Sequence, residues 1–207
     1  MKTLLSSLAL LLTTSAAWAQ QPASSTPELK TLVGPSSHIG FFGATTVQYT
    51  RAAGEDALAL NGRLGVTFNR TLSVGLGGTA LTNGRVPDRR WPDYRPASDN
   101  YLAAAYGGLY IEPQIPTNSV VHLAFPVLIG GGTVTNEDRP STLYRDYHHD
   151  EFFVVEPGVT VEVNVAKFLV LGVGATYRYT SRLDLPGTSR TALNGMGAGV
   201  TVKVGRF

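Results

Sequence analysis

A run of four side chains, His148, His149, Asp150 and Glu151, has the residue types that metal binding or catalysis requires. In an extended chain alternate residues point to opposite sides, so each side of this run offers only two metal ligands. Ser141 would complete the types of a nucleophile, a base and an orienting acid, but the spacing specifies no triad. We therefore interpret the run as a solvated loop and expect no catalytic residue, bound metal or cofactor.

A second stretch mixes cations with aromatic and proline residues. An arginine can bind a phosphate group through two parallel hydrogen bonds, and a tryptophan or tyrosine can anchor a partner. The stretch is therefore a candidate contact loop, with an ordinary polar loop as the alternative. Its candidate contact residues are Arg85, Arg89, Arg90, Trp91, Tyr94 and Arg95.

The clearest signal for a scaffold lies between Phe152 and Thr180. The odd positions from 153 to 165 are almost all apolar, whereas the even positions include Glu156 and Glu162. After a turn at 166–168 the same alternation continues. A period of two indicates β-strands rather than a helix. One apolar face opposite a small, polar face is typical of a hairpin with lipid outside and a narrow polar lumen inside.

The chain divides into eight runs of this kind, each long enough to cross a bilayer when tilted. Short links alternate with longer ones along the chain. This pattern predicts an all-β fold, an eight-stranded antiparallel up-and-down transmembrane β-barrel with short periplasmic turns, longer extracellular loops and periplasmic termini. The runs are His38–Thr50, Ala57–Phe68, Leu72–Leu81, Tyr101–Glu112, Val120–Gly131, Phe152–Val165, Phe168–Thr180 and Ala192–Gly205. The short links are 69–71, 113–119 and 166–167, and the longer ones are 51–56, 82–100, 133–151 and 181–191.

Two segments precede the barrel, which we place at 38–207. Lys2, the apolar run 4–12 and an A-x-A site ending at Ala19 predict a secretory signal peptide over 1–19. Residues 20–37 are rich in proline, serine and threonine and have no period, so we expect a flexible periplasmic tail. The chain has no cysteine for a disulfide, and its formal net charge of +2 gives no indication of nucleic-acid binding.

The phase of the strands places a balanced set of charges inside the barrel. Paired and hydrogen-bonded ions can persist in a confined space, and inward glycines leave room for long side chains. An eight-stranded barrel is only just wide enough to be filled by side chains, so we expect a plugged interior and no open pore. The fourth strand is apolar on both faces, and Glu112 is placed inside because a lipid-facing carboxylate would be costly. The expected network is Arg63, Glu112, His122, Glu156, Glu162, Asn164, Arg178 and Lys203, with Gln48.

A soluble, lipocalin-like periplasmic binding barrel also has eight antiparallel strands. Its outer face would carry scattered charges, whereas the charges of these strands fall on the glycine-rich face. Two aromatic girdles are expected as well, a feature of membrane interfaces. They are Tyr49, Tyr101, Tyr177 and Tyr179 near the longer loops, and Phe41, Phe68 and Phe168 near the turns. These patterns favour the membrane barrel.

Several segments resemble a family of small outer-membrane barrel proteins from Bacteroidetes-type bacteria, of the eight-stranded OmpX and OmpA barrel type. They are HIGFFGATTVQYT, GRLGVTFNRTLSVGLGG, YGGLYIEP, EPGVTVEVNVAKFLVLGVGATYRYTSRLDLPG and VTVKVGRF. The resemblance covers nearly the whole mature chain and implies fold and location, but no activity. Phe207 resembles the terminal aromatic residue of the signal read by the barrel-assembly machinery, although it is out of phase with Val200, Val202 and Val204.

We expect an integral outer-membrane protein of a Gram-negative cell envelope, with a structural, adhesive or surface-binding role carried by its extracellular loops. The expected partners are outer-membrane lipid, lipopolysaccharide, the barrel-assembly machinery and an extracellular partner. The protein is expected not to be an enzyme. A lipid A-modifying hydrolase or acyltransferase is the alternative, because some eight-stranded outer-membrane barrels have that activity.

Overall fold

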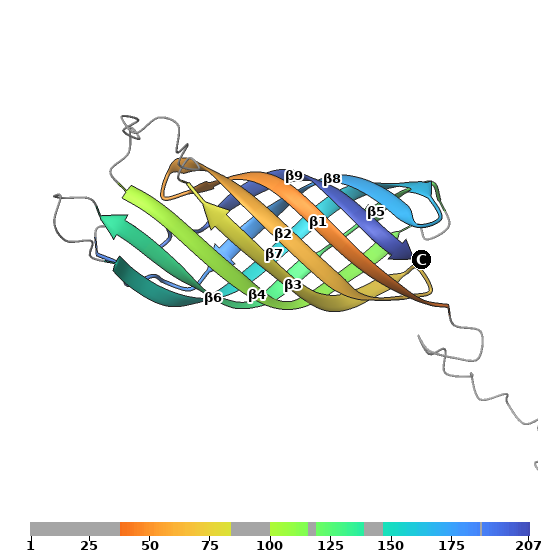
Figure 1. Ribbon diagram of the computed structural model, residues 1–207, viewed down its shortest axis with the longest axis horizontal. Coiled ribbons are helices and arrows are strands. Elements are labelled where there is room, and N and C mark those ends of the chain that lie inside the picture. The colour runs from red at the N-terminus through yellow and green to blue at the C-terminus, as the bar shows by residue number, and fades with distance from the viewer. Residues whose placement is uncertain (1–37, 84–99, 116–118, 139–146, 187) are drawn as a thin grey trace, which may run out of the picture. The chain divides into compact units, whose positions relative to one another are not determined.

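The strands of this protein are long, antiparallel and consecutive (Figure 1). The computed structural model describes residues 38–83, 100–115, 119–138, 147–186 and 188–207. The contact loop, the signal peptide and the tail lie outside these residues, so they remain predictions. The strands are β1 (Ile39–Ala52), β2 (Glu55–Phe68), β3 (Leu72–Thr82), β4 (Asn100–Ile115), β5 (Val121–Ala124), β6 (Val127–Asp138), β7 (Tyr147–Ala166), β8 (Leu169–Thr180) and β9 (Gly195–Arg206).

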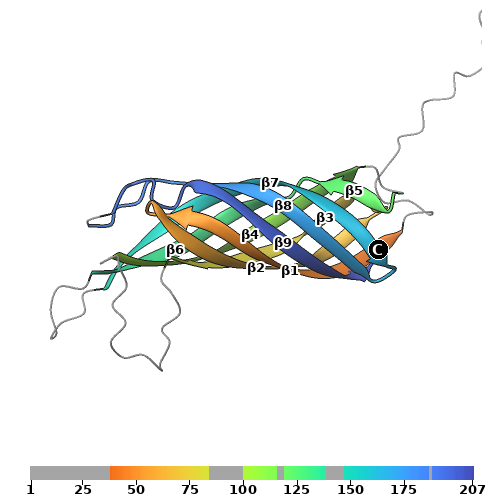
Figure 2. The same ribbon diagram turned by 90° about the horizontal axis from the view of Figure 1, so that it is seen from above.

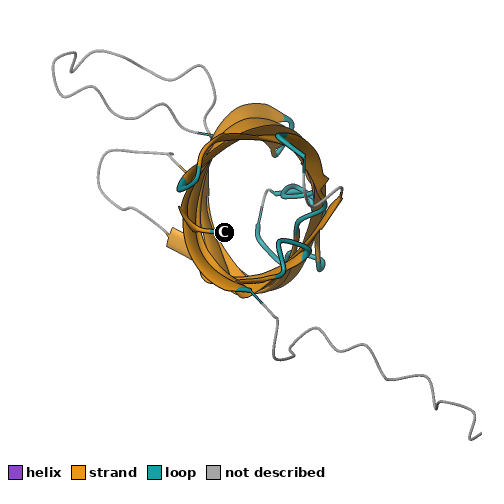
Figure 3. Cartoon of the chain, turned by 90° about the vertical axis from the view of Figure 1, so that its right-hand side faces the viewer, coloured by secondary structure: helices purple, strands orange, loops and turns teal. Residues whose placement is uncertain are grey.

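The sheet closes on itself. Strands β1 to β4 pair in sequence, β5 and β6 both lie between β4 and β7, and β8 and β9 continue the ring. Pairing of β9 with β1, from Phe41↔Arg206 to Thr50↔Gly197, completes the barrel. Figure 3 shows this ring end-on, and Figure 2 shows the strands inclined to the barrel axis. The nine strands therefore occupy eight positions, and the predicted eight-stranded antiparallel barrel is confirmed.

The fifth position differs from the prediction, because the expected strand 120–131 is interrupted at Phe125 and Pro126. Proline has no backbone N–H for the sheet, so it is found at strand edges and irregularities. The backbone still hydrogen-bonds to its neighbours here, through Phe125 N–H to the Pro113 carbonyl at 2.9 Å and Gly158 N–H to the Pro126 carbonyl at 2.8 Å. The wall therefore stays bonded across the break.

The connections define two ends of the barrel. At the turn end, residues 69–71, 116–120 and 167–168 connect β2 to β3, β4 to β5 and β7 to β8, and β1 begins and β9 ends there. At the loop end β1 is joined to β2 by residues 53–54 and β8 is connected to β9 through 181–194, and β3 and β6 end there while β4 and β7 begin there. The expected longer loop at 51–56 is wrong: β1 and β2 are joined by Ala53 and Gly54 alone, with φ of 54° and 82°. Two positive φ angles are the requirement of a type I′ hairpin turn.

The loop predicted over 133–151 is also shorter than expected. Strand β6 continues to Asp138 and β7 begins at Tyr147, so the run from His148 to Glu151 belongs to β7. His149 pairs with Thr135, and Glu151 pairs with Thr133. The interpretation of this run as a solvated loop is therefore wrong, because sheet pairing extends beyond the apolar part of the sequence.

The outward face of the strands is apolar. From 153 to 165 the odd positions of β7 are apolar and exposed, apart from the half-buried Val155, while Phe152, Val154 and Glu156 are buried, which confirms the predicted phase. A water-soluble barrel would show the opposite polarity. Other exposed large apolar side chains include Leu58, Leu60, Leu64, Leu76, Leu109, Ile129, Val173, Val200, Val202 and Val204. Tyr49, Tyr177 and Tyr179 are exposed toward the loop end, and Phe41 and Phe168 toward the turn end.

Candidate functional site

The interior of the barrel holds two layers of polar side chains and one apolar layer. The first polar layer, nearer the turn end, is centred on Lys203, whose side chain is 1% exposed. Its ammonium nitrogen lies 2.6 Å from Glu112 Oε1 and 2.7 Å from Glu162 Oε1. These three residues come from β9, β4 and β7, so the ion pairs join opposite parts of the wall.

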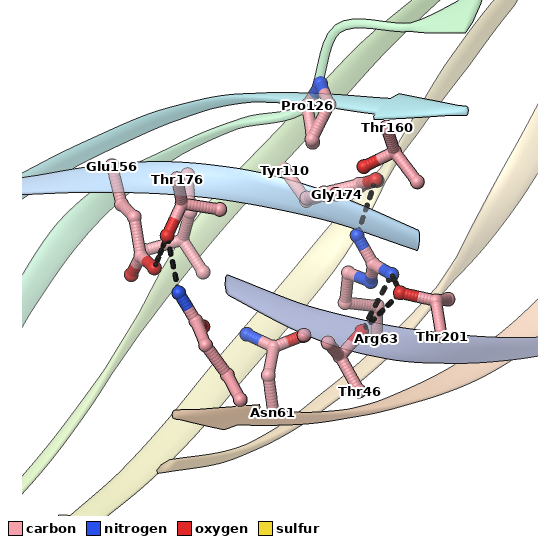
Figure 4. A pocket seen from close by; sticks show the side chains of 13 residues that line it. Thr46, Asn61, Arg63, Tyr110, Pro126, Glu156, Thr160, Gly174, Thr176 and Thr201 are labelled. Atoms are coloured by element: carbon pink, nitrogen blue, oxygen red, sulfur yellow. Dashed lines mark hydrogen bonds between the residues drawn. The ribbon is translucent and has the colours of Figure 1, made fainter. Parts of the chain in front are cut away.

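Arg63 and Tyr110 extend this layer toward the barrel centre (Figure 4). The Arg63 guanidinium donates to Tyr110 Oη at 2.8 Å and to Thr46 Oγ1 at 3.0 Å, and it lies 3.9 Å from Glu112 Oε2. The Tyr110 hydroxyl donates in turn to Glu112. Gln114 donates to the other Glu112 oxygen at 2.9 Å. The buried Glu112 carboxylate is thus bonded on both oxygens, as a charge inside a protein requires.

His122 lies at the turn-end side of the layer, with its Nε2 atom 3.1 Å from Glu162 Oε2. Asn164, expected among the interior residues, is exposed at the barrel mouth and donates to the Ser119 carbonyl at 3.0 Å. A cavity of about 330 Å³ opens beside these residues. Its lining includes Arg70, Lys167 and Phe207.

The second polar layer is built around Glu156 on β7. Tyr106 donates to Glu156 Oε2 at 2.5 Å, and Thr176 donates to Oε1 at 2.8 Å. Gln48 donates to Thr176 Oγ1 at 2.5 Å. Glu156 is therefore held by hydroxyl donors from β4 and β8, where the sequence indicated only that charges would balance.

A smaller cavity of about 40 Å³ separates the two layers. Figure 4 shows Thr46, Asn61, Arg63 and Thr176 around it. Among the described residues, Asn61 Oδ1 and Arg63 Nε are buried without a protein hydrogen-bond partner. A polar space of this size holds a few water molecules, at roughly 10–15 Å³ for each.

Arg178 is 1% exposed. It was expected to pair with a carboxylate, but its described hydrogen bonds go to backbone carbonyls. Its Nε donates to the Leu193 carbonyl at 2.5 Å and its Nη2 to the Arg51 carbonyl at 3.1 Å. The described bonds of this guanidinium therefore tie the β8–β9 connection to the end of β1. A charge-assisted bond to a carbonyl is stronger than a neutral one, so Arg178 fixes this connection firmly.

The β8–β9 connection, residues 181–194, enters the loop end of the barrel instead of forming the expected polar extracellular loop. Its side chains Leu183, Leu185 and Leu193 are buried. They join an apolar cluster with wall residues, whose members are Ala52, Ala57, Ala59, Leu81, Leu102, Ala104, Tyr106, Leu128, Val134, Phe152, Val154 and Ala192. Figure 3 shows loop segments, in teal, inside the ring of strands. We name residues 181–194 the inserted segment.

Further hydrogen bonds hold the inserted segment in place. Thr180 donates through its N–H to Asn194 Oδ1 at 2.8 Å, and Ser181 N–H donates to the Phe153 carbonyl at 2.9 Å. Asp150 Oδ2 accepts a bond from the Asp184 N–H at 2.6 Å. Leu183 and Leu185 alternate with the charged Arg182 and Asp184, and this alternation is a weak sign of a buried side that the sequence prediction did not use.

The structure does not assemble the candidate catalytic residues. Ser141 and the side chain of His148 lie outside the described part of the chain. His149 is exposed, and both Asp150 oxygens accept backbone N–H groups, those of Glu151 and Asp184. The described residues contain no group of three or more potential metal ligands. No helix among them is long and apolar enough to cross a membrane.

Phe207 turns into the barrel, where it packs against the cluster of Phe42, Ala44 and Tyr110. Alternate residues of a strand point to opposite faces, and the exposed Val200, Val202 and Val204 occupy even positions. Phe207 occupies an odd position, which agrees with its inward direction. The Phe207 ring therefore points inward, whereas those valines point outward. Its part in an assembly signal remains a prediction.

Comparisons with known proteins identify the fold. No protein-family model matches the sequence, and no curated protein matches it. Neisserial surface protein A (NspA) superposes with a TM-score of 0.52 at 13% identity, over 81% of this chain and 97% of NspA. The resemblance to barrels of Bacteroidetes-type bacteria remains a prediction.

Two further solved structures are similar at lower TM-scores. The Yersinia pestis attachment invasion locus protein Ail, solved with the heparin analogue sucrose octasulfate, has a TM-score of 0.47 at 14% identity, over 83% of this chain and 97% of Ail. The N-terminal β-barrel domain of Pseudomonas aeruginosa OprF has a TM-score of 0.47 at 10% identity, over 80% of this chain and 96% of that domain. The chain therefore has an eight-stranded antiparallel barrel fold, which it shares with NspA.

Proposed function

We propose that this protein is an integral barrel of the bacterial outer membrane, with the turn end in the periplasm. One observation carries the proposal: the exposed surface of the strands is apolar, while three cations and three carboxylates lie inside. Burial of that apolar surface in lipid removes it from water and stabilises the protein by roughly 25 cal/mol per Å² of buried apolar area. The exposed Tyr49, Tyr177 and Tyr179 near the loop end support the same placement, because tyrosine favours the membrane interface.

Cell fractionation combined with gel electrophoresis tests this placement. The protein is expected in the outer-membrane fraction, with a mobility that changes on boiling because the folded barrel resists detergent. Recovery in the soluble periplasmic fraction without a change in mobility would reject the proposal.

The barrel is closed to the free passage of solutes in this proposal. The ion pairs of Lys203 cross the turn-end half, where a cavity of about 330 Å³ remains beside them, and the inserted segment occupies the loop-end half. A smaller cavity of about 40 Å³ lies between the two polar layers. In planar bilayers the protein is therefore expected to form no large, stable channel. A reproducible open conductance would contradict a closed interior.

Since the interior is filled, we assign function to the loop end as a surface-binding role toward lipopolysaccharide or a partner. Exposed Arg51, Arg182 and Arg190 lie at that end, in addition to the contact loop within 82–100. Arginine binds phosphate bidentately, and lipopolysaccharide is phosphorylated. The proposed contacts are Arg85, Arg89, Arg90, Trp91, Tyr94 and Arg95.

A binding assay with purified lipopolysaccharide tests this role. Replacement of Arg85, Arg89, Arg90 and Arg95 by glutamine is expected to weaken binding, whereas replacement of the same four residues by lysine, which keeps the positive charges, is expected to retain most of it. Equal binding by the two variants would reject the loop assignment. Lipid A mass spectra from cells with and without the gene are expected to be the same. A lost modification would favour the enzyme alternative.

A further inference from the structure

The turn end of the barrel carries exposed cations along one arc of its rim. Arg70 lies in the β2–β3 turn, Lys167 in the β7–β8 turn and Arg206 at the end of β9, and all three are exposed. Because β2, β1, β9, β8 and β7 are neighbours in that order, these cations share one half of the rim. The opposite connection, from Pro113 to Val120, has no ionisable residue.

The direction of Arg206 is specific. It follows Val200, Val202 and Val204 on the outward face of β9, two positions beyond the last exposed valine. It pairs with Phe41, and the Gly205 N–H donates to the Phe168 carbonyl at 3.0 Å, so two exposed aromatic residues flank it. An arginine that ends an apolar stripe extends its guanidinium to the level of the headgroups.

The side-chain charge around this arc is one-sided. Among the described residues of the turn end, the carboxylate side chains are Glu112 and Glu162, and both are buried inside, bonded to Lys203. Arg70 donates to the Phe207 carbonyl at 3.3 Å, which occupies one of the five N–H donors of a guanidinium. Described loop-end residues instead include exposed Glu55, Asp56 and Asp184 beside the arginines.

From this arrangement we propose that Arg70, Lys167 and Arg206 form a site for the phosphate of anionic phospholipid headgroups. The site recruits anionic lipid to one side of the barrel, in the leaflet at the turn end. This inference rests on the proposed membrane location. The apolar face of β9 contacts the acyl chains, and the cations bind the phosphate, since juxtamembrane cations attract anionic lipid.

The absence of cysteine permits a local test with single-cysteine labels. Val204→Cys and Met196→Cys place a fluorophore on the same outward face of β9, at the turn end and the loop end respectively. The labelled full-length mature protein is reconstituted in phosphatidylcholine bilayers. Quenching by nitroxide-labelled phosphatidylglycerol is then compared with quenching by nitroxide-labelled phosphatidylcholine at equal mole fraction.

At position 204 the local concentration of the anionic quencher is expected to exceed that of the phosphatidylcholine quencher roughly fivefold, which corresponds to the attraction of about one cation. This enrichment is expected to disappear in high salt. The triple variant Arg70→Gln, Lys167→Gln and Arg206→Gln is expected to show equal quenching by both lipids. At position 196, near the loop end, the triple variant is expected to leave quenching by either lipid unchanged. Equal quenching at 204 in the parent, or enrichment that persists in the triple variant, would overturn the lipid site. If neither lipid quenches at either position, the barrel is not in the bilayer, and the proposed membrane location fails as well.

Discussion

Lys203 provides the sharpest test of the interior, because one side chain neutralises two buried carboxylates. Its ammonium lies 2.6 Å from Glu112 and 2.7 Å from Glu162. Each pair is worth about 6 kcal/mol of gross attraction at an effective dielectric constant of 20, and most of this is offset by desolvation of the ions. Lys203→Met keeps the apolar stem but leaves a surplus negative charge. The expected loss of stability is about 3–5 kcal/mol, the cost of breaking a buried pair on one side.

The assay is equilibrium unfolding in urea, with the folded fraction measured by the heat-dependent gel mobility. Adding Glu162→Gln to Lys203→Met restores charge balance with Arg63 and is expected to recover about 0.5–3 kcal/mol. The control Lys167→Met removes an exposed lysine at the turn end and is expected to leave the midpoint unchanged. If Lys203→Met costs less than about 1 kcal/mol, or if Glu162→Gln only adds to its cost, the ion pairs do not stabilise the barrel as reasoned.

Three further predictions test other parts of the structure. Val173→Arg, midway along β8, is expected to lower the free energy of unfolding in lipid by about 2–4 kcal/mol, and Met196→Arg, near the end of β9, by about 0–1 kcal/mol. Equal urea midpoints would contradict the placement of Val173 in the middle of the bilayer. Arg178→Met should accelerate tryptic cleavage within the inserted segment, and an unchanged rate would show that its carbonyl bonds do not hold it. Ala53→Asn should stabilise the barrel by about 1 kcal/mol in the same unfolding assay, because asparagine tolerates the positive φ that alanine adopts at strain; a lower midpoint would argue against the turn.

The strands themselves were predictable, because the alternation of apolar and small or polar residues is a direct consequence of a two-sided wall. Phe153 and Glu156 could be assigned to opposite faces from their spacing alone, and the structure agrees. The break at Pro126 had a signal in the sequence, since proline is unusual within a central strand. The tight turn at Ala53 had only a weak signal in the sequence, because alanine rarely adopts the positive φ that this turn requires.

The residues of the interior were predictable by type, but their partners were not. Periodicity places Arg178 inside, yet only the fold shows that it bonds to carbonyls of Leu193 and Arg51. Likewise the inserted segment lies between strands in the sequence, where polar residues suggest an external loop. Its buried leucines depend on the space that closure of the barrel leaves at the loop end, and no local pattern specifies that space.

We propose that the barrel has lipid outside and a closed, charge-paired interior. Cysteine substitutions at each position from Phe152 to Val165 on β7, in the otherwise cysteine-free chain, test it directly in reconstituted bilayers. Fluorophores at the odd positions are expected to be quenched by nitroxide lipids, and cysteines at the buried even positions are expected to resist a water-soluble maleimide. Rapid maleimide labelling at the odd positions without lipid quenching would show a water-soluble barrel and contradict the account.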